Sequence, residues 1–551
     1  MEPHAQLTPD LPDFVREKNG VVYTKSWVVD LLLDLVGYTA DKPLARMLLI
    51  EPSAGDGSFL LRAATRLIES CRSGETPLIE ARSAILAFEI DEASAEKARR
   101  SLWALLRAHG ASPGDAEVLT DAWVRTGDYL LESRSLQGRA HFVVGNPPYI
   151  RLEDLPDGGN AYRSSYLTMR GRADIYVAFF EAALKQLAPE GACGFICADR
   201  WMFNQYGSEL RNLVTTGFSV DTVAQMHLAD AFEEKVSAYP AVTVIRRGRQ
   251  GPVVVASLEA GVEGIGASNM AAVLSGKATA ESMPIKAARL DRWFRGSEPW
   301  SLIAPEKQAL LRRLEAEFPS LEGTGAKVGI GVATGADKVF ITTDTTIAES
   351  ERLIPLALAQ DVRSGEVAWS GNYLVNPWKG KKLVDLSKFP TMARHFEKHR
   401  HLLERRHVGK RNPGSWFRTI DRVDDTLLAM PKLYLPDMSG RIDPVLDEGG
   451  TYPHHNLYFI SPGLWNPKVL GGLLLSDVAQ FFIEAYGVRM RGGYLRFQAQ
   501  FLRRICLPFP SSLEREHELA LVEAFDSRDV AAANVVAAKV FELSREEMNL
   551  L

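Results

Sequence analysis

Four residues suited to chemistry follow a short apolar run in the first third of the chain. The run at 141–145 leads into Asn146, two prolines and Tyr149. The run predicts a buried strand, and open α/β sheets carry their chemical groups at the carboxyl ends of such strands. An amide, two rigid rings and an aromatic side chain at that place predict an active site.

A glycine-containing stretch lies between a predicted strand and a predicted helix nearer the N-terminus. The stretch Glu51 to Gly57, with Ser53 and Gly55 inside it, joins the apolar run 47–50 to a helix expected over 57–70. Glycines let the backbone turn tightly and approach a ligand, and free N–H groups at a helix start favour an anionic group. We therefore expect these residues to contact a cofactor.

Two acids farther along the chain indicate what that cofactor is. Glu89 follows the apolar run 85–88, and a carboxylate there can accept both ribose hydroxyls of a nucleoside. Asp128 could accept the adenine amino group, with Tyr129 beside the ring. The Lys-Ser/Thr of a P-loop does not follow the glycines, so a triphosphate is not expected. The acids suit a cofactor with a positive sulfonium and an ammonium, which makes S-adenosylmethionine the expected cofactor.

Strand and helix patterns alternate through residues 1–250, which we expect to form one domain. The predicted elements after the first helix are the strand 85–88, the helix 92–108, the strand 141–145, the helix 176–187, the strand 193–198 and a final strand pair, 219–226 and 241–245. Such alternation predicts a doubly wound α/β fold, with helices on both faces of a mainly parallel sheet.

The rest of the chain has a different pattern. Small residues between 251 and 300 indicate a boundary region. From 301 to 512, short apolar runs broken by proline, glycine and aromatic residues predict an irregular α+β domain. Residues 513–551 are expected to form a helical C-terminal tail.

Composition is ordinary for a globular protein. The chain has 551 residues, of which 46% are hydrophobic and 24% charged, so two or more domains are expected. The N-terminus lacks a basic region followed by an apolar run, and no stretch approaches the roughly 20 apolar residues of a membrane span. A cytoplasmic protein is therefore expected. The four scattered cysteines, Cys71, Cys193, Cys197 and Cys506, are expected to be buried thiols rather than metal ligands.

Positive charge is concentrated in two segments of the second half, although the net charge is −5. Residues 398–422 contain eight Lys/Arg against two acids, together with three histidines. Residues 489–504 contain five arginines and no acid. Guanidinium groups pair with phosphate and with guanine edges, so these segments favour a nucleic-acid partner. A solvated helix face is the alternative for each.

Together these motifs resemble those of the gamma class (Taq-type) of DNA adenine-N6 methyltransferases, enzymes of restriction-modification and related defence systems. The resemblance covers residues 20–250 and implies a Rossmann-like methyltransferase domain. The matching cofactor segments are Gly20 to Thr24, which implies contact of Thr24 with the methionine carboxylate, then Glu51-Pro52 with Gly55 to Gly57 for the methionine, Glu89 for the ribose, and Asp128-Tyr129 for the adenine. The acids are farther apart in this chain than the family pattern predicts.

The remaining matches concern the target base. Asn146 to Tyr149 matches the NPPY motif, residues 174–180 the helix after it, and Ala231 to Ser237 the motif whose aromatic faces a flipped base, here Phe232. The resemblance implies base flipping, because the target atom is inaccessible inside a duplex. Tyr149 would cover one face of the base and Phe232 the other, and stacking is worth about 1–3 kcal/mol per base.

The chemistry of an amino group explains the need for two acceptors. An adenine amino nitrogen is a poor nucleophile because its lone pair is delocalised into the ring. The Asn146 side-chain oxygen and the Pro147 carbonyl can each accept one amino hydrogen, which favours a tetrahedral nitrogen with its lone pair directed at the methyl group. The prolines fix φ and hold both acceptors. Direct methyl transfer then requires no metal.

The second half resembles, less closely, the target-recognition domains of the same class. Gly329 to Phe340 resembles the start of such a domain, and 491–497 with 507–510 resemble its end. The resemblance implies double-stranded DNA as partner, and Arg405 to Arg418 is the first candidate for contact with it. A cognate restriction endonuclease would be a separate chain.

Other functions remain open at this point. NPPY also occurs in methyltransferases of a protein glutamine amide, whose nitrogen has the same delocalised lone pair. RNA is another candidate substrate, and a non-enzymatic DNA-binding module would require vestigial motifs. The sequence favours a sequence-specific DNA adenine-N6 methyltransferase, because a basic second half follows the cofactor motifs and NPPY.

Overall fold

The structure is a computed structural model that describes residues 23–155, 159–171, 173–234, 239–291, 293–294, 296–301, 303, 305–363, 365–489 and 494–551. The chain divides into unit 1, Met1–Ser301, and unit 2, Leu302–Leu551. Parts of three predicted motifs, Gly20 to Val22, Lys235 to Ser237 and Arg491 to Gly493, lie outside the described residues.

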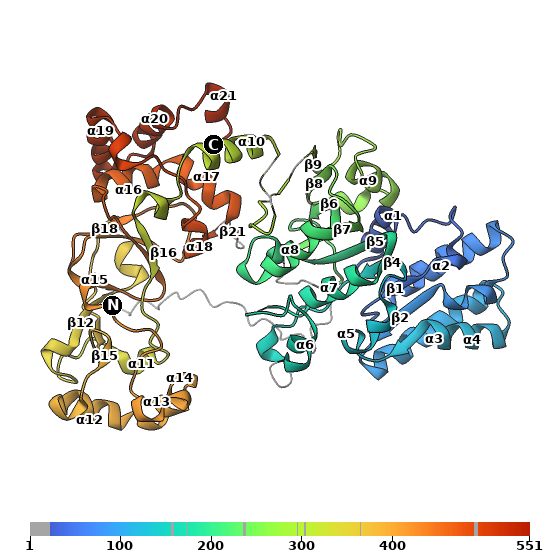
Figure 1. The fold of residues 1–551 in the computed structure, drawn as a ribbon, viewed down its shortest axis with the longest axis horizontal. Coiled ribbons are helices and arrows are strands. Elements are labelled where there is room, and N and C mark those ends of the chain that lie inside the picture. Colours follow the sequence, from blue (N-terminus) through green and yellow to red (C-terminus); the bar gives the residue numbers. More distant parts are fainter. Residues whose placement is uncertain are drawn as a thin grey trace, which may run out of the picture. The chain divides into compact units, whose positions relative to one another are not determined.

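A nine-stranded sheet forms the centre of unit 1, with the order β3-β2-β1-β4-β5-β7-β6-β8-β9 (Figure 1). The strands are β1 Leu49–Glu51, β2 Ile85–Glu89, β3 Val124–Thr126, β4 Ala140–Gly145, β5 Leu187–Ala198, β6 Phe218–Gln225, β7 Pro240–Arg247, β8 Val253–Leu258 and β9 Ile285–Leu290. Pairing is parallel from β3 through β5, and β7 runs antiparallel to both neighbours.

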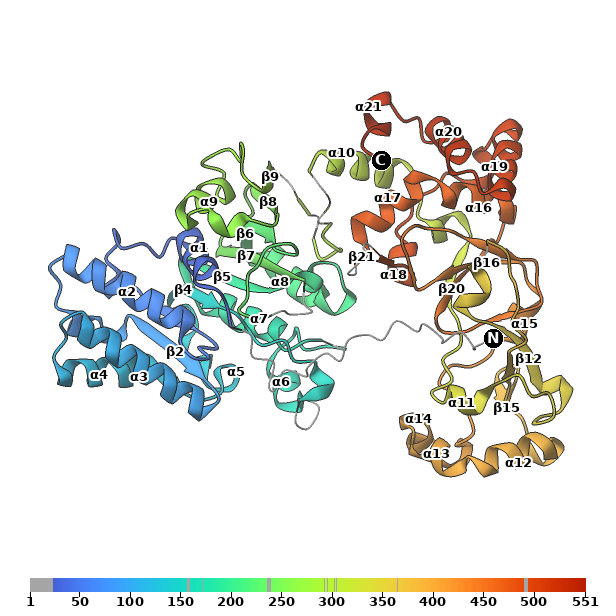
Figure 2. The same ribbon diagram turned by 180° about the vertical axis from the view of Figure 1, so that it is seen from behind.

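Helices cover both faces of this sheet, which confirms the predicted fold class (Figures 1 and 2). The helices are α1 Ser26–Val36, α2 Ser58–Ser73, α3 Glu92–Ala108, α4 Pro113–Trp123, α5 Tyr129–Glu132, α6 Asn160–Ser165, α7 Tyr176–Gln186, α8 Ser208–Gly217 and α9 Ala267–Leu274. Side chains of a strand alternate between faces. Ile196 of β5 accordingly joins the core shared by α1 to α4 and α9, whereas Phe195 packs on Phe180 of α7 with ring centroids 5.0 Å apart.

The strand order brings two loops together. The chain leaves β1 toward β2 and β3 on one side and returns to β4 on the other side. In such a sheet the loops after the two diverging strands meet at the topological switch point, where open α/β proteins bind their ligands. Here these are the loops that contain Glu51 to Gly57 and Asn146 to Tyr149.

The segment 251–300 differs from the sequence prediction of a boundary region. It supplies β8, α9 and β9 to unit 1, so the pair β6 and β7 is not the last of the sheet. Val253 to Leu258 is an apolar run that pairs in parallel with β6. The glycines at 261–266 that suggested a boundary form only the turn before α9.

Unit 2 contains several small sheets surrounded by helices, as its irregular pattern predicts. Its strands are β10 Lys327–Ile330, β11 Ile341–Thr342, β12 Leu353–Ala357, β13 Tyr373–Val375, β14 Trp378–Lys379, β15 Lys382–Leu383, β16 Lys432–Pro436, β17 Met438–Ser439, β18 Val445–Asp447, β19 Tyr452–Pro453, β20 Leu457–Ser461, β21 Val488–Arg489 and β22 Leu495–Arg496. They form sheets in the orders β10-β20-β16-β18, β11-β13-β12-β19, β14-β15 and β17-β22-β21.

The helices of unit 2 include the predicted C-terminal tail, which is formed by α19 to α21. The helices are α10 Pro305–Glu317, α11 Asp337–Phe340, α12 Pro390–Lys398, α13 Arg400–Arg405, α14 His407–Arg411, α15 Asp425–Ala429, α16 Pro467–Leu475, α17 Asp477–Tyr486, α18 Ala499–Leu502, α19 Arg515–Ser527, α20 Val530–Val540 and α21 Arg545–Met548. Arg313 of α10 pairs with Glu547 of α21 at 2.8 Å, which ties the tail to the start of the unit.

Two further observations concern the whole chain. All four cysteines are buried and free, as predicted. Among the described helices, none alone is long and apolar enough to span a membrane, although α16 and α17, bent by 65°, reach that length and composition together.

Candidate active site

The loops after β1 and β4 are in direct contact. The Ser53 hydroxyl donates to the backbone carbonyl of Asn146 at 3.1 Å. Ser53 was predicted as a cofactor residue and Asn146 as a catalytic one, and the structure brings them together at the switch point. The predicted cofactor stretch and NPPY therefore form one site.

Glu89 holds the glycine turn of the first loop. Its two carboxylate oxygens accept from the backbone N–H of Gly55 at 2.7 Å and of Asp91 at 2.9 Å. Gly55 and Gly57 have φ values of 56° and 97°, a region that favours glycine. The turn thus requires both glycines. Each oxygen of Glu89 retains a second lone pair for a ligand.

Glu51 is a buried carboxylate without a partner. Its side chain is 1% exposed, and neither oxygen has a hydrogen-bond partner among the described residues. Burial, followed by the charges of Glu89 and Asp56, raises the pKa of Glu51 well above its ordinary value. An ionised carboxylate in this position needs a cation or strong donors. The site therefore fits a ligand that brings a positive ammonium.

Asp128 and Tyr129 have different surroundings. Asp128 caps α5, accepts from the backbone N–H of Leu130 at 2.9 Å, and accepts from the Tyr162 hydroxyl at 2.6 Å. Tyr129 is 2% exposed, stacks on Phe179, and donates from its hydroxyl to Gln186 at 2.9 Å. The Tyr129 ring thus packs among buried side chains, and its predicted contact with the cofactor adenine stays a prediction.

Asn146 is held at both ends of its side-chain amide. Nδ2 donates to the Thr24 hydroxyl at 3.2 Å, and Oδ1 accepts from the Tyr149 hydroxyl at 2.9 Å. Asn146 and Tyr149 are each partly exposed. The carbonyl oxygen of Pro147 accepts no hydrogen bond from the described residues. Two acceptors, one side-chain amide and one backbone carbonyl, are therefore adjacent at this strand end.

The N-terminal segment and the Phe232 motif lie side by side. Thr24 forms an antiparallel bridge with Phe232, and the backbone N–H of Lys25 donates to the Ala231 carbonyl at 3.0 Å. This pairing places Thr24 next to Asn146 and links both predicted motifs. Phe232 itself is 6% exposed and belongs to the core. Its ring would have to become more exposed to cover a base.

The start of α7 anchors the chain after NPPY. The backbone N–H of Ile175 donates to the Ile150 carbonyl at 2.9 Å, and Arg151 and Asp174 form an antiparallel bridge. The rings of Tyr149 and Tyr176 meet edge to face, with centroids 6.4 Å apart. The predicted helix after the catalytic loop thus fixes the direction of Tyr149.

Comparisons with known proteins identify the family to which the chain belongs. Residues 83–232 match a family model described as Eco57I restriction-modification methylase. The type II methyltransferase M.PaeR7I of Pseudomonas aeruginosa is 42% identical over 548 residues, which cover 97% of this chain and 94% of that protein. The chain belongs to the type II methyltransferases of restriction-modification systems. M.XhoI of Xanthomonas vasicola, also a type II methyltransferase, is 40% identical over 97% of this chain and 99% of that protein.

The fold of this type II methyltransferase has a counterpart among solved structures. It is similar to the type IIL restriction-modification enzyme MmeI, solved in complex with DNA, with a TM-score of 0.60 at 12% identity. The match covers 95% of this chain and 75% of that chain. At this identity the similarity concerns the fold. The recognition of a restriction-modification methyltransferase from sequence is confirmed by the curated relatives.

Sequence reasoning missed two side-chain contacts in this methyltransferase. Tyr162 lies on α6, beyond NPPY, and its hydroxyl contacts Asp128. Thr24 was assigned to the cofactor alone, without its contact to Asn146. Both are separated from their partners along the chain, Tyr162 by 34 residues and Thr24 by 122. Only the strand order could have indicated such contacts.

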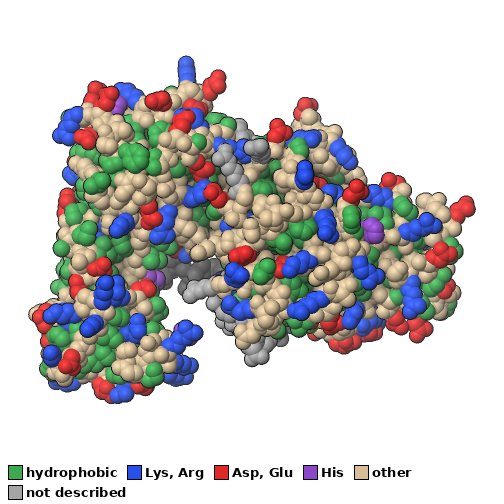
Figure 3. All heavy atoms as spheres, in the orientation of Figure 1, with side chains coloured by type: hydrophobic (Ala, Val, Ile, Leu, Met, Phe, Trp, Pro, Cys, Tyr) green, Lys and Arg blue, Asp and Glu red, His purple; other side chains and the backbone are tan. Residues whose placement is uncertain are grey.

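The predicted DNA-contact segment, Arg405 to Arg418, contains two kinds of arginine. Arg406 donates to the backbone carbonyls of Thr334 at 2.7 Å and Arg418 at 2.8 Å, and burial lowers its pKa to about 10. Arg405 is exposed, and no described residue pairs with its guanidinium. Figure 3 shows Lys and Arg side chains at the end of unit 2 that carries α13 and α14.

Proposed function

We propose that this protein transfers a methyl group to N6 of an adenine in duplex DNA. The observation that carries the proposal is the pair of acceptors, Asn146 Oδ1 and the Pro147 carbonyl, beside a loop with a buried, unpartnered Glu51. The two acceptors suit an amino group, and the buried carboxylate of Glu51 suits a positively charged cofactor. Membership of the type II methyltransferases supports both.

S-adenosylmethionine is the cofactor that the residues fit. Glu51 would pair with its ammonium, Glu89 would accept from its ribose hydroxyls, and Asp128 would accept from its adenine amino group. Thr24 and Ser53 border the same space through their contacts with Asn146. The cofactor supplies a methyl group on a positively charged sulfur. No residue of the site is proposed to bind a metal.

The catalytic work of the chain is to localise a lone pair. Asn146 Oδ1 and the Pro147 carbonyl each accept one hydrogen of the adenine amino group, which draws its nitrogen toward tetrahedral geometry. Thr24 and Tyr149 hold the Asn146 amide in place, so little reorganisation is needed when the base arrives. After the transfer, one of the two amino hydrogens leaves the methylated nitrogen to solvent as a proton.

The adenine has to be flipped out of the duplex, because the two acceptors at the end of β4 cannot reach its amino group while the base is stacked and paired. Tyr149 is our proposed stacking face because its ring is partly exposed next to Asn146. Phe232 is proposed as the second face. Its ring is now in the core, so base entry would have to expose it.

Unit 2 is proposed to recognise the DNA sequence. The segment Arg405 to Arg418 supplies exposed guanidinium groups, those of Arg405 and Arg411, for phosphate contacts, and the structurally similar MmeI was solved in complex with DNA. We further propose that a separate restriction endonuclease reads the same site, as the restriction-modification family implies.

One incubation tests the proposed reaction. The protein is mixed with S-adenosylmethionine labelled on its methyl group and with duplex DNA, RNA or a glutamine-containing protein extract. We expect label only on DNA, and we expect digestion of that DNA to nucleosides to give labelled N6-methyladenosine in its deoxy form. Label on RNA or on protein alone, or label on cytosine, would refute the proposal. Sequencing modified bases in DNA from expressing cells would identify the site.

A further inference from the structure

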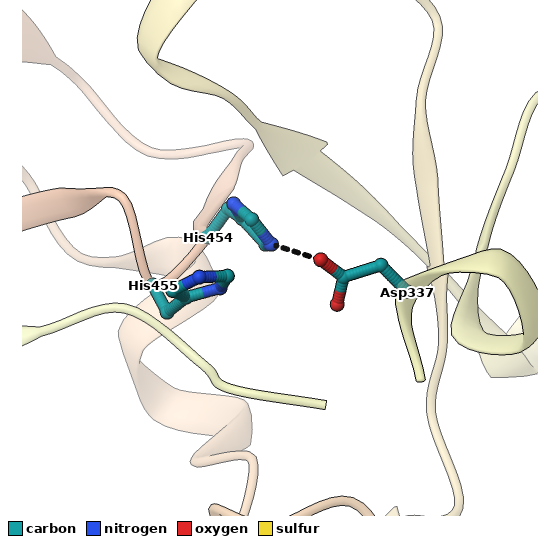
Figure 4. A group of neighbouring side chains, drawn as sticks. All are labelled: Asp337, His454 and His455. Atoms are coloured by element: carbon teal, nitrogen blue, oxygen red, sulfur yellow. Dashed lines mark hydrogen bonds and ion pairs between the residues drawn. The ribbon is translucent and has the colours of Figure 1, made fainter. Parts of the chain in front are cut away.

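Asp337, His454 and His455 form a cluster of metal-ligating side chains in unit 2 (Figure 4). Asp337 is the first residue of α11, and the two histidines lie between β19 and β20. One ligand atom of each residue lies within 4.8 Å of the others. The candidate active site lies in unit 1 and uses none of these residues.

The spacing of the closest pair is that of two ligands of one ion. Asp337 Oδ2 and His454 Nε2 are 3.3 Å apart. A charge-assisted hydrogen bond is shorter, about 2.7–2.9 Å. Two ligands of a tetrahedral zinc ion, each at about 2.0–2.1 Å from the metal, are roughly 3.3–3.4 Å apart. The pair thus matches the edge of a coordination tetrahedron better than it matches a strong hydrogen bond.

His454 also lacks contacts that a buried imidazole normally has. Its ring is 6% exposed, and its Nδ1 has no hydrogen-bond partner among the described residues. Nε2, the ring nitrogen that faces Asp337, is the atom available to an ion. Figure 4 shows the His455 ring beside that of His454, and their centroids are 4.0 Å apart.

Two carboxylates outside the cluster act on it electrostatically. The carboxylates of Asp337, Asp421 and Asp437 all act electrostatically on His455. Asp437 is offset by an ion pair with Arg496 at 2.6 Å. The Asp421 carboxylate accepts from the backbone N–H of Ala333 at 2.9 Å. These three carboxylates favour a cation at the cluster, whereas burial and the neighbouring His454 oppose one.

We propose that Asp337, His454 and His455 bind one divalent transition-metal ion in unit 2. Two imidazoles and one carboxylate suit Zn²⁺, with water as the remaining ligand. His455 is exposed and would reach the ion by turning its side chain. The proposal does not depend on the proposed methyl transfer.

Such an ion would fix the loop between β10 and α11. Gly331 of this loop already lies against the His454 carbonyl so closely that a Cβ atom would be 2.1 Å from it. The Thr334 carbonyl accepts from Arg406, so the loop also supports the segment that carries α13 and α14. The ion is therefore a structural link between the β19–β20 connection and the proposed DNA-contact segment.

The test uses the full chain, freed of metal with a chelator, and titrates it with zinc chloride by calorimetry. We expect one ion per chain. His455→Ala and Asp337→Asn should weaken binding by more than the roughly 10- to 100-fold that loss of an outer-shell partner causes. His401→Ala, at an exposed histidine of α13, is the matched control and should bind like the wild type. Cobalt in place of zinc should give the intense visible absorption of tetrahedral coordination.

The thermal midpoint of unfolding distinguishes a bound ion from a simple hydrogen bond between Asp337 and His454. Zinc should raise the thermal midpoint of the wild type and of His401→Ala, but not that of His455→Ala. The proposal is overturned if the wild type binds no zinc, or if His455→Ala and Asp337→Asn bind it as the wild type does. It is equally overturned if Asp337→Asn lowers the midpoint by the same amount with chelator and with zinc.

Discussion

The Asn146 side-chain amide forms hydrogen bonds through both its nitrogen and its oxygen. Its Nδ2 donates to Thr24, and its Oδ1 accepts from Tyr149. The orientation of the amide is thus supported from both sides before a base arrives. An acceptor held in this way stabilises charge that develops on the amino nitrogen without first having to reorganise.

Replacing Asn146 with Ala should abolish most of the methyl transfer. Loss of one preorganised hydrogen-bonding group at a reacting atom costs about 2.7–4 kcal/mol, or roughly 100- to 1,000-fold in kcat. Binding of S-adenosylhomocysteine should stay close to that of the wild type, because Asn146 is proposed to contact the base. Single-turnover transfer and calorimetry measure the two quantities. Loss of cofactor binding together with transfer would contradict the assigned role.

Glu51 makes cofactor affinity depend on pH. Burial and the neighbouring carboxylates raise its pKa in the cofactor-free protein, so the group stays protonated to a higher pH than usual. Since an ammonium pairs with the ionised form, affinity for S-adenosylmethionine should rise as pH increases through this raised pKa. Glu51→Gln should bind more weakly, by about 1.5–3 kcal/mol, with this rise removed. Calorimetric titrations with S-adenosylmethionine across pH measure this affinity. If the affinity of Glu51→Gln depends on pH as that of the wild type does, the role of Glu51 is contradicted.

The same substitution should affect stability in the opposite direction. A carboxyl whose folded pKa exceeds its unfolded value stabilises the fold fully below the unfolded pKa, and this contribution is lost as pH rises through the folded pKa. Cofactor-free Glu51→Gln should therefore be more stable than the wild type above that pH. Near pH 4 the difference should vanish. Denaturant titrations at both pH values provide the measurement, and equal stability at high pH would count against a buried, ionised Glu51.

At the scale of elements, apolar patterning predicted most of unit 1. Strands such as β1 and β4 are apolar runs bounded by turns, so their existence and order were readable from the sequence. β3 has three residues and no such run, and it was missed. β5 also begins earlier than predicted, at Leu187 rather than at residue 193.

Side-chain direction was less predictable than the elements themselves. Asp128 and Tyr129 are adjacent, yet one caps a helix near the surface and the other points into the core. A motif identifies neighbours along the chain, whereas direction depends on which strand lies alongside. The pairing of Thr24 with Phe232 is of the same kind, because it joins two segments of unit 1 that lie far apart along the chain.

Two consecutive arginines at the end of α13 should behave differently. Arg406→Ala should lower the stability of unit 2, because several partly buried carbonyls lose their donor at about 1–3 kcal/mol per unsatisfied group. Arg405→Ala should leave the thermal midpoint unchanged. It should weaken DNA binding and reduce the slope of log affinity against log salt by about 0.9, the value for one phosphate contact. Thermal melts and salt-dependent binding assays test both. Unaltered salt dependence in Arg405→Ala would remove it from the interface.

At the scale of the whole molecule, the two units have separate hydrophobic cores. Unit 1 contains the candidate active site, and unit 2 contains the basic segments and the Asp337, His454 and His455 cluster. A net charge of −5 gives the whole chain no general attraction for DNA, so binding must depend on local positive surfaces. Domains with their own cores can unfold as independent units.

A ligand should therefore raise the temperature of only one unfolding transition, that of the unit to which it binds. S-adenosylhomocysteine at 100 times its dissociation constant should stabilise unit 1 by about 2.7 kcal/mol. For units of this size that corresponds to a rise of roughly 5–10 °C in one calorimetric transition, while the other stays in place. Glu51→Gln should reduce this shift, and zinc should move the second transition alone. A single transition that moves as a whole with either ligand would mean that the units unfold cooperatively, and that binding in one unit stabilises both.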